Sequence, residues 1–134
     1  MNKDFVFKIL EHKEWFNNEE EYKGSLIDLK DGFIHLSSVN QIYETCKKHF
    51  FGRENLIVIY FKIKDLGNNL KWEKSRNNDL FPHYYGNLKK ELMIGFFELR
   101  RIADGSHEFP KDFITGKFFN LSLIHISEPT RPQC

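Results

Sequence analysis

Hydrophobic and polar positions along the chain divide it into several short segments that favour strands and one that favours a helix. Residues 5–10 and 56–63 are rich in β-branched, aromatic and other apolar side chains, which predicts two strands. Because the run 56–63 is almost wholly apolar, we expect it to be the central strand of a sheet, with both faces covered. The alternating segment 70–73 and the apolar run 92–99 predict further strands.

The most regular helical pattern covers residues 38–51. Ser38 and Gln41 have the spacing of a capping box, which predicts a helix start, and Gly52 offers a left-handed stop at the other end. Apolar side chains at three- and four-residue spacing form one stripe, made of Val39, Ile42, Tyr43, Cys46 and Phe50. The polar stretch 11–23 contains no Pro or Gly and allows a second, short helix.

Two segments have turn residues that leave their structure open. The apolar runs 26–29 and 33–36 are joined by Lys30-Asp31-Gly32, which predicts either a hairpin or a turn entering a single strand. Residues 81–86 are dense in aromatic side chains but contain Pro82, which argues against a central-strand ladder. We expect this second segment to line a surface or a cleft.

Composition narrows the class of protein without indicating its chemistry. The 134 residues, 40% hydrophobic and 29% charged, are typical of one globular domain, which we assign to residues 1–120. Residues 121–134 resemble translated adapter sequence, and we exclude them from the fold. The net charge of +1 does not indicate nucleic acid or a membrane surface as a partner.

Compartment and metal content follow from other features. The first ten residues lack the unbroken apolar run of a secretory signal, and the chain has no apolar stretch of about twenty residues, so we expect no membrane span. The two cysteines, Cys46 and Cys134, lie outside any zinc or redox spacing, so we expect no metal and a cytoplasmic location. Cys46 lies on the apolar stripe and is interpreted as a small buried hydrophobe.

Three positions are candidates for chemistry. If 33–37 is a strand, His35 shares a face with Phe33 and Ser37, where it is either a proton-handling or ligand-anchoring group or a structural residue. His83 follows a proline and precedes two tyrosines, a setting that either stacks a planar ring or plugs the core. Arg76, in a polar loop, is either a phosphate or carboxylate ligand or a solvated side chain. The sequence contains none of the common dinucleotide, nucleoside-triphosphate, zinc-protease or serine-hydrolase motifs.

The motifs Asp31-Gly32-Phe33-Ile34-His35-Leu36-Ser37 and Leu80-Phe81-Pro82-His83-Tyr84-Tyr85-Gly86, flanking Trp72-Glu73 and Arg76, resemble the bacterial domain of unknown function 952 family over about residues 5–99. The resemblance implies an α+β, ADP-ribosyltransferase-like fold: two small antiparallel sheets around a cleft, with the helix 38–51 packed on one side. The cleft of such a fold holds NAD or a related nucleotide. The resemblance makes His35 and Ser37 ribose contacts, Tyr84 or Tyr85 the wall that stacks on the nicotinamide, and His83 and Arg76 supporting or phosphate contacts.

The function implied is an NAD- or nucleotide-using enzyme that transfers an ADP-ribosyl or phosphoryl group, with NAD as substrate. Cleavage of the glycosidic bond of NAD develops positive charge on the ribose, which a carboxylate stabilises. Glu98, on the late strand, is the acid that suits this role, so the expected catalytic set is His35, His83 and Glu98. The alternative is a non-catalytic module that binds a small molecule or a peptide on the same fold.

Overall fold

A four-stranded antiparallel sheet, which we call sheet A, forms the centre of the molecule. The computed structural model describes residues 4–116, without the side chain of Arg76. Sheet A has the order β1-β4-β8-β9, with β1 at Phe5–Glu11, β4 at Leu56–Lys62, β8 at Gly95–Arg101 and β9 at His107–Glu108. The prediction of a central strand over 56–63 is confirmed, because β4 lies between β1 and β8 and its residues 56–61 are buried.

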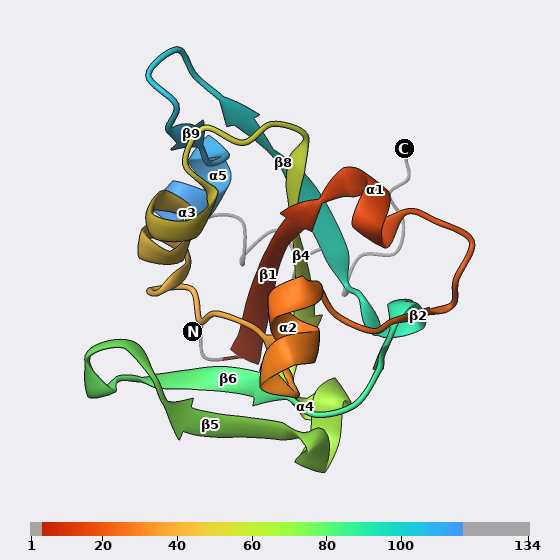
Figure 1. Cartoon of the computed structure of the whole chain (residues 1–134). Coiled ribbons are helices and arrows are strands. Elements are labelled where there is room, and N and C mark those ends of the chain that lie inside the picture. Colours follow the sequence, from red (N-terminus) through yellow and green to blue (C-terminus); the bar gives the residue numbers. More distant parts are fainter. Residues whose placement is uncertain (1–3, 117–134) are drawn as a thin grey trace.

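Helices cover one face of sheet A. Figure 1 shows α3 (Ile42–Phe50) and α5 (Lys111–Thr115) together on one side of β1 and β4. Phe7 of β1 and Cys46 of α3 belong to the core cluster on this face, in which Phe113 of α5 packs edge-on to Phe7 with ring centroids 5.4 Å apart. The predicted helix 38–51 is confirmed over its centre but begins later, at Ile42. The Gln41 side chain accepts a hydrogen bond from the Ser38 amide at 3.0 Å, and residues 39–41 form a turn.

A three-stranded antiparallel sheet, which we call sheet C, lies on the other side of sheet A. Its order is β3-β6-β5, with β3 at Ile34–His35, β6 at Leu80–Tyr84 and β5 at Leu70–Lys74. The prediction that Pro82 keeps residues 81–86 out of a central strand is wrong, because β6 is the middle strand. The Pro82 carbonyl accepts a hydrogen bond from the Leu36 amide at 3.0 Å. Since the nitrogen and carbonyl of one residue point to the same side of a strand, the Pro82 nitrogen faces Leu36, one residue past the two-residue ladder of β3, and the missing N–H removes no hydrogen bond from that ladder.

The space between the two sheets is filled. Ile34 and Tyr84 of sheet C, with Leu36 directly after β3, belong to the same core cluster as Val6 of β1 and Phe61 of β4. The prediction of sheets splayed around a cleft is therefore corrected here: apolar side chains from both sheets close the gap because alternate residues of β3 and β6 point inward. Two short strands, β2 (Glu21–Tyr22) and β7 (Leu88–Lys89), pair beside this cluster and add Tyr22 and Leu88 to it.

The segment before β3 is a helix followed by a tight turn. Ser25 caps α2 (Leu26–Asp31) in a capping box with Asp28, and Gly32 ends the helix in the left-handed region at φ 87°. Of the two structures predicted for 26–36, the hairpin is therefore wrong and the turn into a single strand is confirmed.

The helix allowed by residues 11–23 is only α1 (His12–Trp15). The remaining short elements are α4 (Ile63–Leu66), η2 (Gly67–Asn69), η3 (Arg76–Asn78) and η4 (Lys90–Leu92).

The described part of the chain is a mixed α+β structure of small antiparallel sheets and short helices. No helix within residues 4–116 is long and apolar enough to cross a bilayer. The segment 121–134, which the sequence sets apart as adapter-like, lies outside the described residues.

Candidate functional site

Sheet C has one face against the core and one face away from it, and the second face carries the chemistry. Ile34 and Tyr84 are cross-strand partners on the core face, so the next pair, His35 and His83, points to the opposite face. Lys71 and Glu73 of β5 follow the same alternation. Ring contacts join Phe33 and Tyr85 to the set. We call this set the histidine face: Phe33, His35, Lys71, Glu73, His83 and Tyr85.

The two histidines lie close together. Their ring centroids are 5.6 Å apart in an edge-on arrangement, and their backbones are directly paired across β3 and β6. The sequence places these residues 48 positions apart, so the antiparallel pairing of the strands is what brings them together.

His35 is held between two carboxylates. Its Nδ1 lies 2.6 Å from Asp28 Oδ1 and its Nε2 lies 3.0 Å from Asp31 Oδ2. A carboxylate only accepts hydrogen bonds, so both ring nitrogens donate when the ring is protonated, whereas the neutral ring satisfies one carboxylate at a time. Asp28 is buried, and the Asp31 side chain is partly exposed at 38%. The Nε2 side of His35 is therefore the side that a molecule from solvent reaches.

Asp28 is the buried anchor of this arrangement. The carboxylate accepts hydrogen bonds from the amides of Ser25 at 3.0 Å and His35 at 3.1 Å, and it pairs with Lys8 Nζ at 3.1 Å. Burial raises the pKa of Asp28, but the hydrogen bond from the His35 ring and the charge of Lys8 outweigh burial and hold that pKa well below its usual range. Gly24 leaves room for this carboxylate, since a Cβ there would lie 2.7 Å from the Asp28 Cβ.

Lys8 reaches the site from sheet A. Its Nζ also donates a hydrogen bond to the His35 carbonyl at 3.0 Å, and the residue is buried. A buried ammonium is costly unless it is paired and hydrogen-bonded. Lys8 and Asp28 supply each other's counter-charge and together fix both the backbone and the ring of His35.

His83 has its own carboxylate. Its Nδ1 lies 2.8 Å from Glu73 Oε1, and the Tyr85 hydroxyl donates to Oε1 at 2.8 Å, with Oε2 at 3.1 Å. The hydrogen bonds from His83 and Tyr85 lower the pKa of Glu73, and the same carboxylate raises the pKa of Tyr85. Phe33 stacks on the His83 ring with centroids 4.0 Å apart, and His83 is only 4% exposed. The Nε2 of His83 has no hydrogen-bond partner among the described residues.

The structure separates the other predicted site residues. Tyr84 points into the core between the sheets, so it provides no exposed stacking wall, whereas Tyr85 lies on the histidine face. Ser37 is buried, and its Oγ donates to Thr45 Oγ1 at 3.4 Å. Because Ser37 also exchanges backbone hydrogen bonds of 2.8 Å with Phe7, its place is the junction of β3 and sheet A.

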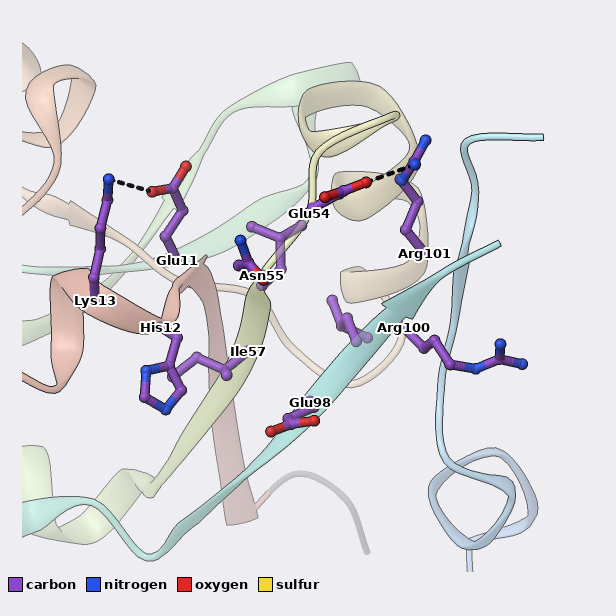
Figure 2. Close-up of a pocket in the computed structure, with 11 residues that line it drawn as sticks. Glu11, His12, Lys13, Glu54, Asn55, Ile57, Glu98, Arg100 and Arg101 are labelled. Carbon is purple, nitrogen blue, oxygen red and sulfur yellow. Dashed lines mark hydrogen bonds and ion pairs between the residues drawn. The ribbon is translucent and has the colours of Figure 1, made fainter. Parts of the chain in front are cut away.

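Glu98 lies away from the histidines. It is exposed on β8 and lines a pocket at the ends of β1, β4 and β8, together with Glu11, His12, Arg100 and Arg101 among others (Figure 2). No residue of the histidine face lines that pocket. The expectation that Glu98 joins His35 and His83 is therefore corrected: the carboxylate beside His83 is Glu73. The backbone of Arg76 lies in η3, between β5 and β6.

Sequence reasoning missed Lys8, Asp28, Phe33 and Glu73 as parts of the site, and the sequence carries a signal for two of them. Lys8 shares a strand face with Val6 and Leu10, so its charge faces the core and needs a partner. Asp28 stands three residues after Ser25, the spacing of a capping box. Glu73 is found only once the register of β5 and β6 is known. In the described part of the chain, no three His, Cys, Asp or Glu side chains are grouped so as to hold a metal ion.

The fold and the histidine face define a small α+β protein with two carboxylate-held histidines on paired antiparallel strands. Residues 9–95 match the sequence profile of the family described as Protein of unknown function (DUF952), and the chain belongs to that family. No curated protein matches the chain.

Solved structures of one protein are similar to this chain. The crystal structure of protein CC0527 from Caulobacter crescentus is 37% identical, with a TM-score of 0.77 over 82% of this chain and 98% of that one. The solution NMR structure of CC0527 is 40% identical, with a TM-score of 0.68 over 75% of this chain and 89% of that one. The similarity therefore covers both the fold and nearly the whole length of CC0527.

Proposed function

We propose that this protein binds a nucleotide of the NAD class on the histidine face and transfers a group from it, as an ADP-ribosyltransferase-like enzyme. The observation that carries the proposal is the pairing of His35 and His83, 5.6 Å apart, each held by its own carboxylate. Two titratable groups in different environments on one face are the usual arrangement for proton transfer and for binding developing charge.

Different residues of the site contact different parts of the nucleotide in this proposal. With its ring protonated, His35 donates from Nε2 to a ribose hydroxyl while Nδ1 donates to Asp28, which fixes the orientation of the ring. Tyr85 and Phe33 supply aromatic surface for a planar base. Arg76, in the adjoining turn, is our candidate for a phosphate contact.

Glu73 takes the part that the sequence assigned to Glu98. When the bond between ribose and nicotinamide breaks, its electron pair leaves with the nicotinamide nitrogen and the ribose carbon becomes cationic. A carboxylate with a lowered pKa is anionic at neutral pH and stabilises that cation until a nucleophile adds to the carbon. His83 and Tyr85 hold Glu73 in position through their hydrogen bonds.

One observation favours a second candidate function, a non-catalytic binding module. Phe33 covers the His83 ring, and both nitrogens of His35 already face carboxylates. In that case the rings act as structural parts of a surface that binds a small molecule or a peptide.

Calorimetric titration with NAD and an assay for released nicotinamide separate these possibilities. We expect saturable binding of NAD, and nicotinamide release that falls at least about a hundredfold in Glu73→Gln, as for loss of a group that stabilises transition-state charge. Asp65→Asn, which removes an exposed carboxylate on α4, is the control, and we expect it to retain both NAD binding and nicotinamide release. Binding without release in the wild type supports the binding module, and absence of binding refutes both functions for this nucleotide.

A further inference from the structure

The contact between Asp31 and His35 Nε2 has no role in the proposed function and is unfavourable for the helix that carries it. Asp31 is the last residue of α2, and a carboxylate in the last turn lies at the negative end of the helix dipole. Its side chain is partly exposed, so its contact with His35 competes with water. Helix stability does not explain an aspartate at this position.

In this contact the protonated His35 ring donates to Asp31, so a ligand that replaces the contact meets one donor and one acceptor at the edge of the histidine face. Nε2 of His35 and Oδ2 of Asp31 are 3.0 Å apart. A hydroxyl group both donates and accepts a hydrogen bond, so it binds such a pair with both of its functions satisfied. A phosphate oxygen accepts from His35 but meets the negative charge of Asp31, and like charges at this separation repel.

We propose that Asp31 is a specificity-determining residue that reserves the His35 end of the site for the diol of a sugar and excludes phosphate from it. This inference rests on the proposed function, because it names the part of the nucleotide that His35 takes. One sugar hydroxyl replaces the direct contact: it accepts from Nε2 of the protonated His35 ring and donates to Asp31, while the neighbouring hydroxyl donates to the second oxygen of Asp31. Asp28 keeps the opposite ring nitrogen engaged throughout.

The rigidity of the neighbouring backbone supports this assignment. Gly32 follows Asp31 with φ 87° and donates its amide to the Asp28 carbonyl at 2.9 Å. The same carbonyl accepts from the Phe33 amide at 3.2 Å. Asp28 therefore positions both the turn after Asp31 and the His35 ring, which keeps the Asp31 backbone beside that ring.

Three small probes test the inference without a nucleotide. Methyl β-D-riboside carries the diol without phosphate, methyl 2-deoxyriboside lacks one hydroxyl, and inorganic phosphate carries the excluded charge. The His35 ring signals, followed by NMR during each titration, report binding at Nε2. We expect the riboside to bind the wild type at least about fivefold more tightly than the deoxyriboside or phosphate, since one well-placed hydrogen bond is worth that factor.

Asp31→Asn keeps the shape and removes the charge. We expect the riboside to bind this variant about tenfold more weakly and phosphate to bind it more tightly than the wild type. Asp31→Ser is a second variant without a carboxylate, for use if the first does not fold, and Asp65→Asn is the control with unchanged preferences. Tighter binding of phosphate than of riboside by the wild type overturns the inference, and so does the absence of any change in the His35 signals. Calorimetry with NAD on the same samples shows separately whether the proposed function fails.

Discussion

Asp28→Asn is expected to be the most destabilising conservative substitution at the site. The Asp28 carboxylate accepts three hydrogen bonds, from two amides and the His35 ring, and pairs with the Lys8 ammonium at 3.1 Å. The asparagine side chain keeps one acceptor oxygen. Its NH2 group replaces the second carboxylate oxygen and cannot accept the hydrogen bonds that this oxygen accepts in the wild type. Lys8, 7% exposed, is then left with the His35 carbonyl and no counter-charge.

The magnitude follows from that uncompensated charge. Removing one partner of a buried ion pair costs about 3–5 kcal/mol of unfolding free energy, and we expect about 3 kcal/mol here because a hydrogen bond to the carbonyl remains. For a domain of this length, that loss lowers Tm by roughly 12 °C. At an m value of about 1.5 kcal/mol per molar urea, it lowers the urea midpoint by about 2 M.

Urea denaturation of four proteins, followed by tryptophan fluorescence, measures the effect: the wild type, Asp28→Asn, Lys8→Met and the double variant. Because the double variant carries neither charge, we expect it to be about 2 kcal/mol more stable than the sum of the two single losses implies. Asp65→Asn is the control, within about 0.5 kcal/mol of the wild type. A loss below about 1 kcal/mol in Asp28→Asn, or additive losses in the double variant, would refute the assignment of a buried pair.

Three further outcomes are expected. The lowered pKa of Asp28 means that its stabilisation is complete above the unfolded-state pKa of about 4 and is lost as pH falls toward the folded-state pKa, so Tm measured from pH 5 to 2 should fall more steeply in the wild type than in Asp28→Asn. Glu73→Gln should change the Nδ1 signal of His83 in nitrogen-detected NMR and leave Tm nearly unchanged, because Glu73 is partly exposed. Burial raises the pKa of Cys46 to about 11, so in a Cys134→Ser background iodoacetamide at pH 8 should label Cys46 in urea but not in the folded protein.

The sequence predicts the parts of the fold in which the apolar side chains are buried and the polar side chains are exposed. The all-apolar run of β4 is buried on both faces, and the apolar stripe of α3 covers sheet A, so pattern and structure agree there. The hydrophobic pattern of segment 26–29 does not predict its structure, because its apolar residues are exposed: Leu26, Ile27 and Leu29 face solvent on α2. The hydrophobic pattern indicates a strand or a hairpin there, whereas the capping box between Ser25 and Asp28 stabilises a helix.

The candidate site divides in the same way. His35 and His83 stand out in the sequence by residue type and by their neighbours, and the structure pairs them. Tyr84 and Tyr85 are equivalent in sequence, and only the alternation of β6 sends one to the core and the other to the surface. Glu73 replaces Glu98 beside His83 because of strand register, which no local pattern specifies.

The histidine face also depends on how the two sheets pack together, because two successive residues of β1 in sheet A contact the chain on either side of β3. Phe7 binds the β3 end through backbone hydrogen bonds with Ser37, and Lys8 binds it through a side chain that reaches Asp28 and the His35 carbonyl. Asp28, which Lys8 contacts, precedes His35 in the chain, and Ser37, which Phe7 contacts, follows it. The ring is therefore fixed only when β1 and β3 are in register. A substitution that loosens the packing between the sheets, such as Phe61→Ala in the shared core, should therefore disorder the His35 ring although Phe61 does not belong to the histidine face. The orientation of the imidazole is a property of the whole fold, which is why residue type identifies His35 while only the tertiary structure reveals what holds it.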